Sequence, residues 1–160
     1  MMFEYIRDTV KPDILVWTGD NTNHAIWDSN VEEVLMSTTN ITLMMTQVFK
    51  NTKITVIPIN GNHDFFPAND QDMSLGPNNN SYINEYATQW NEAGWLTDNE
   101  TKVFKQYGYY SKNLTLKDGR VFTNTKVIAL NTLACYQYNF NIINSRYDPG
   151  NQIDWLTAEL

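Results

Sequence analysis

The sequence predicts a single α/β domain in which mixed β-sheets are flanked by helices. Two continuous apolar runs, residues 14–17 and 54–57, have the character of strands that are covered on both faces. A segment with helical spacing separates the two runs, so they are expected to form a right-handed parallel crossover. The length of 160 residues and the 42% of hydrophobic residues suit one domain with one core.

The first half of the chain contains two predicted helices. Apolar residues at helical spacing indicate a helix over residues 2–10, which Pro12 ends. Ser29 and Glu32 have the spacing of a capping box, in which two side chains satisfy free amides at the start of a helix. The helix that follows this signature is expected to run to about residue 50.

The second half adds another helix and then a pair of antiparallel strands. A helix is predicted over residues 81–91, because its apolar residues fall on one face. Residues 107–116 and 121–122 alternate in polarity around an Asp-Gly turn, which is typical of a β-hairpin. Residues 127–130 predict another buried strand, and a final helix is expected after residues 148–150.

The acidic composition narrows the classes of partner. The chain carries 11 Lys and Arg residues against 18 Asp and Glu residues, which gives a net charge of −7. No basic patch is available to neutralise phosphates, so we expect no nucleic-acid polymer as a partner. Residues 1–8 are too polar for a secretory leader, and no apolar run has the length of a transmembrane segment. The oligomeric state is left open.

The side chains that can carry chemistry directly follow the two parallel strands. Residues 19–21 read Gly-Asp-Asn, and residues 61–64 read Gly-Asn-His-Asp. Ligands of open α/β sheets bind at the carboxyl ends of the strands, and Asp, Asn and His suit divalent metals. The alternative interpretation makes Asp20 and Asn62 turn residues that tolerate a left-handed backbone. Two such motifs on successive strands favour the metal site.

These motifs resemble those of a known family. Residues 19–20 and 61–64 resemble the second and third motifs of the calcineurin-like metallophosphoesterases. Residues 15–21, residues 61–67 and residues 141–156 are similar to the acid sphingomyelinase-like phosphodiesterases within that superfamily. The resemblance covers essentially the whole chain and implies the layered α/β sandwich of the metallophosphoesterases, here in part.

The resemblance implies a phosphodiesterase with two divalent metal ions, usually zinc, between which a hydroxide attacks phosphorus. By position, Asp20 would be the carboxylate that bridges both metals, and Asn62 would bind the second metal through its amide oxygen. His63 would protonate the leaving alkoxide or stabilise charge on the phosphoryl oxygens. His24 matches another family histidine near the substrate phosphate, with a solvated loop residue as the alternative.

Several neighbours of these residues have open roles. Asp64 is expected to orient His63 or to cap the turn rather than to bind metal. Phe65 and Phe66 either stack on a substrate or pack structurally. Asn131 follows a strand, and its position could bring it near the site. Three tyrosines are expected to pack the hairpin against the sheet: Tyr107, Tyr109 and Tyr110.

The resemblance also implies that part of the family pattern is missing. An Asp-x-His motif is expected before Asp20, and a histidine with a Gly-His-x-His motif is expected after Leu160. His24 and His63 are the only histidines of the sequence, so Asp20 and one amide remain as ligands, fewer than a zinc site needs. Cys135 is expected to pair with a cysteine beyond Leu160.

Residues 1–160 are therefore expected to be a single incomplete metallophosphoesterase catalytic domain, the middle of a larger secreted or lysosomal enzyme. Alone, the chain should be poorly soluble and bind less than one zinc ion tightly. The alternative is a non-catalytic remnant that only binds a ligand or partner. A flavodoxin-like module shares the alternation of strands and helices, but it explains neither motif and needs a phosphate-cradling glycine loop.

The sequence leaves the substrate open between two kinds of phosphodiester. A soluble nucleotide or other small molecule is the first expectation, and a sphingomyelin-like lipid is the alternative. Four asparagines lie in acceptor sequons for N-glycosylation, although some sequons arise by chance in an Asn-rich chain: Asn40, Asn79, Asn99 and Asn113.

Overall fold

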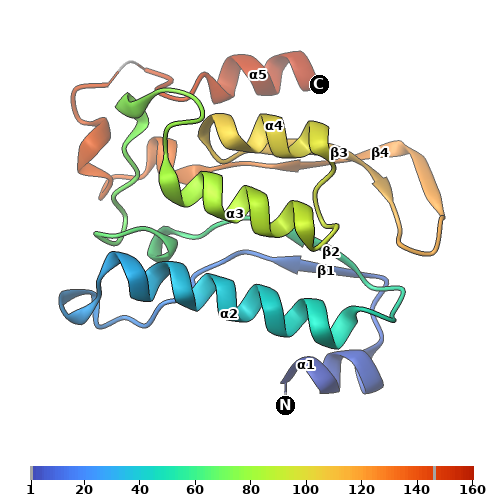
Figure 1. Cartoon of the computed structure of the whole chain (residues 1–160). Helices are drawn as coiled ribbons and strands as arrows, with labels where there is room; N and C mark the ends of the chain where they lie inside the picture. The colour runs from blue at the N-terminus through green and yellow to red at the C-terminus, as the bar shows by residue number, and fades with distance from the viewer. Residues whose placement is uncertain (1, 146) are drawn as a thin grey trace.

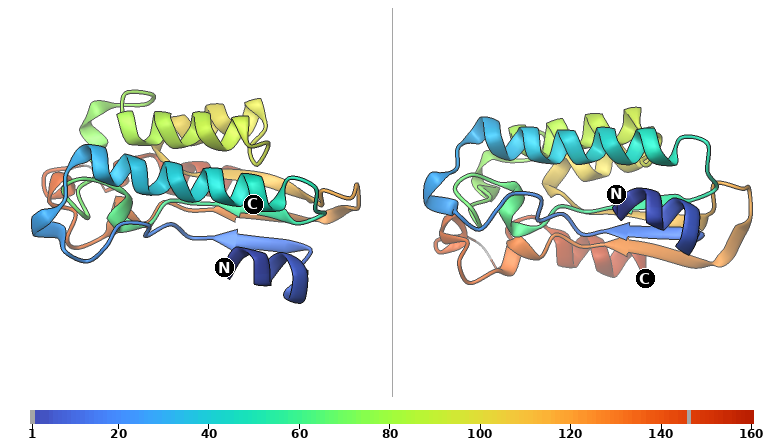
Figure 2. Two further views of the ribbon diagram at one scale, coloured as in Figure 1. Left: turned by 60° about the horizontal axis from the view of Figure 1, so that its bottom comes forward. Right: turned by 90° about the horizontal axis from the view of Figure 1, so that it is seen from below.

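The computed structural model describes residues 2–145 and 147–160 and has the predicted α/β architecture (Figure 1). A layer of strands runs through the molecule. Figure 2 shows helices α2, α3 and α4 on one side of this layer and helix α5 on the other. On the described residues, no helix is long and apolar enough to cross a membrane.

The first half forms the predicted parallel crossover. Helix α1 (Met2–Tyr5) continues as a π-helical turn (Ile6–Val10), which confirms helical structure over residues 2–10. Strand β1 (Ile14–Trp17), helix α2 (Val31–Phe49) and strand β2 (Thr55–Pro58) follow. The two strands pair in parallel, so the loops that follow β1 and β2 begin at the same edge of the pair.

The start of helix α2 differs from the prediction by one residue. Asn30, rather than Ser29, is the N-cap, and its side-chain oxygen accepts the Glu33 backbone N–H at 3.0 Å. The Ser29 hydroxyl instead donates to the Ala25 carbonyl at 3.2 Å. The predicted pairing of Ser29 with Glu32 is therefore wrong, because the residue beside it, an equally good cap, takes the position.

Strand β1 is not covered on both faces, which corrects another expectation. Trp17 packs against Trp90 and Trp95, with ring centroids 5.8 and 6.0 Å away, on the face that meets the helices. Val16 points to the opposite face because side chains alternate along a strand, and it is 62% exposed. The next strand meets the expectation, since Val56 and the residue after it are buried.

The second half contains the predicted helix α3 (Ser81–Glu92) and final helix α5 (Gln152–Glu159). Between them, strands β3 (Tyr110–Thr115) and β4 (Val121–Ala129) pair antiparallel, which confirms the hairpin. The predicted strands at residues 121–122 and 127–130 are the two ends of one continuous strand, β4. Short helical turns fill the loops: Ile26–Asp28, Asn62–Asp64, Met73–Leu75, Thr132–Cys135 and Phe140–Ile142.

Helix α4 (Asp98–Tyr107) was not predicted, and it shortens the first strand of the hairpin. A capping box begins it: Thr97 accepts the Glu100 N–H at 3.3 Å, and Glu100 accepts the Thr97 N–H at 2.8 Å. Gly108, with φ of +85°, ends the helix and redirects the chain into β3. The prediction of a strand from residue 107 is therefore wrong.

An aromatic cluster fills the core between the helices and the strands. Trp90 lies 5.9 Å from Tyr86 and 5.1 Å from Phe104, measured between ring centroids, and all three side chains are buried. Tyr110 of the hairpin packs on this cluster as expected, and its hydroxyl donates to the Pro58 carbonyl at 2.8 Å. Tyr109 packs instead on the other side, against helix α5.

Candidate metal and phosphate site

The two predicted motifs meet at the carboxyl edge of the parallel strand pair. Trp17 and Pro58 are register partners at the ends of β1 and β2, so the loops that follow start side by side. The first loop carries Asp20, and the second forms a single helical turn, Asn62–Asp64. This edge is where open α/β sheets bind their ligands.

The backbones of the two loops approach each other so closely that only glycine fits. A Cβ atom on Gly19 would lie 2.2 Å from the Gly61 nitrogen, and one on Gly61 would lie 2.2 Å from Asp20 Oδ1. Gly19 also has φ of +73°, in the left-handed region that glycine adopts readily. The glycines of both motifs therefore serve to bring the polar side chains together.

Asp20 and Asn62, the predicted metal ligands, line one cavity of about 430 Å³. Asp20 has φ of +60°, and its Oδ1 accepts the His63 backbone N–H at 3.0 Å. Asn62 donates its side-chain Nδ2 to Asn69 Oδ1 at 2.7 Å. Neither Asp20 Oδ2 nor Asn62 Oδ1 makes a hydrogen bond with the residues that the structure describes.

This donor set fits a divalent metal ion but does not complete its coordination. Carboxylate and amide oxygens are suitable metal ligands, and one oxygen of Asp20 and one of Asn62 are left available. Within residues 2–145 and 147–160, no group of three or more His, Cys, Asp and Glu side chains is placed to hold a metal. That Asp20 and Asn62 bind metal stays a prediction.

The structure also brings the two predicted catalytic histidines together. The rings of His24 and His63 are 4.4 Å apart between centroids and inclined by 56°. His24 lies in the exposed loop before the turn Ile26–Asp28, and His63 lies in the turn Asn62–Asp64. His63 Nδ1 is buried and has no hydrogen-bond partner in the described part of the chain. His63 lines a small hollow that is separate from the cavity of Asp20 and Asn62.

Asp64 is buried, with 1% of its surface exposed. Its carboxylate caps the turn Asn62–Asp64, which confirms one of the two roles expected for it. Its Oδ2 accepts the N–H groups of Asp20 at 2.9 Å and of Gly61 at 2.8 Å. Its Oδ1 accepts both the backbone and side-chain N–H groups of Asn21 at 3.0 and 2.9 Å. Burial raises the pKa of the Asp64 carboxyl, and the three backbone amides oppose this shift.

Phe65 and Phe66 lie in different environments. Phe65 is buried between Tyr82 and Tyr86, at ring-centroid distances of 5.6 and 6.5 Å, so the structural alternative holds for it. Phe66 is half-buried and lines a small hollow next to His63. Phe66 is thus the member of the pair that lies near the candidate catalytic groups.

Asn131 lines the same cavity as Asp20, but its amide is engaged in the protein interior. Its Nδ2 donates to Gln71 Oε1 and to the Tyr107 carbonyl, both at 2.6 Å. Its backbone N–H donates to Gln152 Oε1 at 2.6 Å. Asn131 therefore joins a buried amide network that supports the floor of the cavity.

Sequence reasoning missed this network and the role of Asn69. Gln71 and Asn139 are both about 1% exposed, although amides are usually found at the surface. Asn139 Nδ2 donates to the backbone carbonyls of Gln71 and Leu133, both at 3.0 Å. The Asn-rich composition was the available signal, but composition does not indicate which amides are buried.

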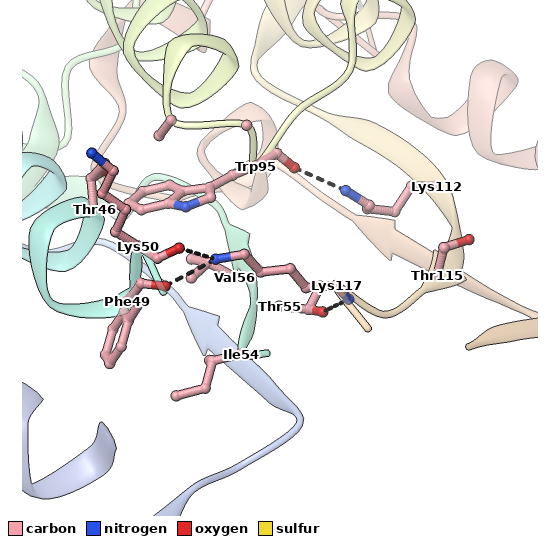
Figure 3. Close-up of a pocket in the computed structure, with 12 residues that line it drawn as sticks. Thr46, Phe49, Lys50, Ile54, Thr55, Val56, Trp95, Lys112, Thr115 and Lys117 are labelled. Atoms are coloured by element: carbon pink, nitrogen blue, oxygen red, sulfur yellow. Dashed lines mark hydrogen bonds between the residues drawn. The ribbon is translucent and has the colours of Figure 1, made fainter. Parts of the chain in front are cut away.

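A second cavity, of about 340 Å³, lies at the opposite end of the strands (Figure 3). Lys117 Nζ donates to the carbonyls of Phe49 and Lys50 at 2.9 and 3.2 Å, at the end of helix α2. Lys112 Nζ donates to the Trp95 carbonyl at 2.9 Å. These ammonium groups satisfy free carbonyls and join the hairpin to the helices, which is a structural role.

The four sequon asparagines all have exposed side chains. Asn40 lies on α2, Asn99 on α4 and Asn113 on β3, and Asn79 precedes α3. Glycan attachment needs such accessible positions, and whether glycans are attached stays a prediction. Cys135 is a free, exposed thiol, and its pairing with a cysteine outside the chain also stays a prediction.

Comparison with known proteins decides the family. A model of the calcineurin-like phosphoesterases matches residues 1–156. The chain belongs to the calcineurin-like phosphoesterase family. In this family context, the mixed α/β architecture is the expected fold, and the resemblance drawn from the Gly-Asp-Asn and Gly-Asn-His-Asp motifs is confirmed.

Relatives of this calcineurin-like phosphoesterase chain include proteins named as sphingomyelin phosphodiesterases. Sphingomyelin phosphodiesterase A of Dictyostelium discoideum is 31% identical, with 100% of this chain and 26% of the relative covered. Sphingomyelinase phosphodiesterase C of the same organism is 33% identical, with coverage of 99% and 32%. Acid sphingomyelinase-like phosphodiesterase 3b of Mus musculus is 34% identical, with coverage of 91% and 29%. The chain thus spans about a quarter to a third of these relatives.

Proposed function

We propose that the protein containing this chain is a metal-dependent phosphodiesterase. One observation carries the proposal: Asp20 and Asn62, from neighbouring strand ends, line one cavity, and His63, the residue after Asn62, pairs its ring with that of His24. Metal ligands and proton-transferring groups next to each other are the parts that phosphodiester hydrolysis requires. The named activities of the relatives support the same reaction class.

Asp20 and Asn62 would hold two divalent cations, which we propose to be Zn²⁺, together with ligands from outside the described residues. The bound cations supply Lewis acidity and lower the pKa of a water molecule. Asp20 would hold the cations through the oxygen that has no protein partner among the described residues, since the His63 N–H fixes the other oxygen. Asn69 orients the Asn62 amide by accepting from its nitrogen.

His63 and His24 would act on the phosphate itself. An imidazole can give a proton to the alkoxide that leaves, and it can hydrogen-bond a phosphoryl oxygen on which negative charge grows. The 4.4 Å between the two rings allows both to reach one phosphate group. The backbone of His63 is held by Asp20, so its ring is placed relative to the candidate metal position.

The substrate is proposed to be a small-molecule or lipid phosphodiester. The relatives carry sphingomyelin in their names, which supports a sphingomyelin-like lipid, while a soluble nucleotide remains the other candidate. A secreted or lysosomal location with N-glycans is proposed alongside, because the four sequon asparagines are exposed.

The test is hydrolysis of bis(4-nitrophenyl) phosphate by the intact protein, before and after metal removal with a chelator and re-addition of Zn²⁺. Activity should disappear on chelation and return with Zn²⁺. Asp20→Asn and His63→Gln should each lower kcat by at least about 100-fold. Asp28→Asn is the matched control, since Asp28 is an exposed carboxylate eight residues beyond Asp20.

Two outcomes would redirect the proposal. A protein that binds Zn²⁺ or a phosphodiester without hydrolysing it would favour the alternative, a non-catalytic binding protein of the family. Activity that Asp20→Asn leaves unchanged would reject the site. With activity established, sphingomyelin vesicles and CDP-choline, a nucleotide with a pyrophosphate bond, compared at equal molar concentration would separate lipid from nucleotide substrates.

A further inference from the structure

Asp64 connects the two loops of the candidate site without lining its cavity. Five donor groups face its carboxylate, from Asp20, Asn21, Thr38 and Gly61. They belong to both motif loops and to helix α2. A carboxylate with both oxygens this fully engaged, and with its side chain buried, has no oxygen to spare for a metal.

One oxygen of Asp64 holds both loops at once. Oδ2 accepts the Asp20 N–H at 2.9 Å and the Gly61 N–H at 2.8 Å, from segments that lie more than 40 residues apart. Asp20 directs its N–H to Asp64 from a left-handed backbone with φ of +60°. A non-glycine residue adopts that backbone only when its surroundings compensate for the strain. The two hydrogen bonds provide such a compensation.

We propose that Asp64 is a positioning residue that keeps Asp20 and Asn62 in register across the two strand ends. It acts through the backbone: it fixes Asp20 in its left-handed conformation, and it fixes Gly61, which precedes Asn62. Its consequence for metal binding rests on the proposed function. Its consequence for the two loops does not, because the hydrogen bonds to Asp64 join only residues of this chain.

A purely structural role is the competing explanation. Any buried, hydrogen-bonded residue stabilises a fold, and its loss lowers the free energy of unfolding. Tyr86 offers the matched control, since its hydroxyl donates to the backbone carbonyl of Asp64. Tyr86→Phe therefore weakens the same buried region while it leaves the four donors of Asp20, Asn21 and Gly61 in place.

The experiment compares wild type, Asp64→Asn and Tyr86→Phe in the intact protein, at a temperature where each is folded. Backbone hydrogen exchange is measured without metal. Asp64→Asn replaces an acceptor with an amide nitrogen that faces donors, so exchange should rise at least tenfold in both motif loops, at Asp20, Asn21 and Gly61 together. Exchange in strand β2 should stay unchanged, and Tyr86→Phe should leave both loops within twofold of wild type.

The second readout is the dissociation constant for Zn²⁺, measured by competition with a chromophoric chelator. Asp64→Asn should weaken binding at least tenfold and alter the visible absorption spectrum of the Co²⁺-loaded protein, while Tyr86→Phe changes neither. If Asp64→Asn does not fold, Thr38→Val removes the donor from Thr38 to Asp64 and also the acceptor of the Asn21 side-chain amide, and it should raise exchange at Asn21 by about threefold.

Loss of stability with unchanged loop exchange and unchanged Zn²⁺ affinity would overturn the proposal, and so would faster exchange in residues 61–64 alone. Failure of the proposed function has a different signature. In that case wild type binds no Zn²⁺, or Asp20→Asn binds it as tightly as wild type does, and the exchange data still decide the role of Asp64.

Discussion

His63 donates its backbone N–H to Oδ1 of Asp20 at 3.0 Å, although the two residues are 43 positions apart. A candidate catalytic residue and a candidate metal ligand are thus fixed to each other by the main chain of one and the side chain of the other. The bond occupies one carboxylate oxygen and leaves the second available. A substitution that moves the backbone of one loop is therefore expected to displace the other loop as well.

Gly61→Ala should damage the site by steric contact alone. The added Cβ would lie 2.2 Å from Asp20 Oδ1 and 2.8 Å from the Asp20 nitrogen, and a backbone nitrogen cannot swing aside. We expect a loss of about 2–3 kcal/mol in the free energy of unfolding. Zn²⁺ affinity of the intact protein should fall at least tenfold. Urea denaturation and chelator competition measure the two effects.

Gly94→Ala is the matched control for this substitution. Gly94 has φ of +73°, but no atom of residues 2–145 and 147–160 lies within 4 Å of the added Cβ, so alanine there meets backbone strain without a clash. Its cost should be about 1 kcal/mol, with unchanged Zn²⁺ affinity. Equal Zn²⁺ affinities in Gly61→Ala and Gly94→Ala would refute the steric argument.

Asn131→Asp should destabilise the fold because its side chain faces acceptors. Asn131 Nδ2 donates to the Gln71 side chain and to the Tyr107 carbonyl, and a carboxylate oxygen there would meet two oxygens. A buried, unpaired charge of this kind should cost about 3 kcal/mol or more. Thermal denaturation measures the cost, and Asn99→Asp, the same change at an exposed position, should shift the midpoint little.

The strand ends and the glycines that follow them are the part of the site that could be predicted from the sequence. Apolar runs followed by Gly-Asp-Asn and Gly-Asn-His-Asp place Asp20 and His63 at one edge, and the structure brings them into hydrogen-bond contact. This prediction succeeds because two paired parallel strands place the loops that follow them side by side. At these positions the local sequence pattern and the overall fold are consistent.

Other features could not be predicted, because they depend on the path of the folded backbone and not on the local sequence pattern. Helix α4 had a readable start in Thr97 and Glu100, but its single buried residue, Phe104, gives a weak apolar period. Ser29 and Asn30 are both good caps, and only the backbone path decides between them. The pairing of Asn131 with distant amides needs the folded chain before it can be stated.

Lys117→Met should loosen the attachment of the hairpin to helix α2. Its ammonium donates to the Phe49 and Lys50 carbonyls, where the helix dipole and free carbonyls favour a cation. Since Lys117 is exposed, we expect a loss of only about 1 kcal/mol. Chemical denaturation measures it. Lys102→Met, at an exposed position on α4, should stay within about 0.5 kcal/mol of wild type.

Tyr109 should make stability fall in alkaline solution. Burial raises the pKa of its hydroxyl to about 12, from an ordinary value of 10.0, and nearby Asp148 adds to the shift. The unfolded chain releases this proton near pH 10 while the folded chain retains it. The stabilising contribution is therefore complete below pH 10 and is lost as the pH rises toward 12.

Denaturation curves between pH 9 and pH 11.5 measure this dependence, together with phenolate absorbance at 295 nm. Tyr109→Phe removes the titrating group and the hydrogen bond to the Gly150 carbonyl. It should start less stable and lose less stability across the range. A slope as steep in Tyr109→Phe as in wild type would assign the alkaline effect to other groups.

The 160-residue chain on its own should bind fewer than one Zn²⁺ ion tightly. A zinc site needs three or four protein ligands, and Asp20 and Asn62 are the two predicted ligands that line the cavity. Two oxygens without histidine or thiolate partners hold Zn²⁺ weakly, so competition with a chromophoric chelator should strip it readily. Asp20→Asn should remove the remaining weak binding, whereas Asp28→Asn should not. Tight binding of two zinc ions per chain would show that these residues complete the site by themselves.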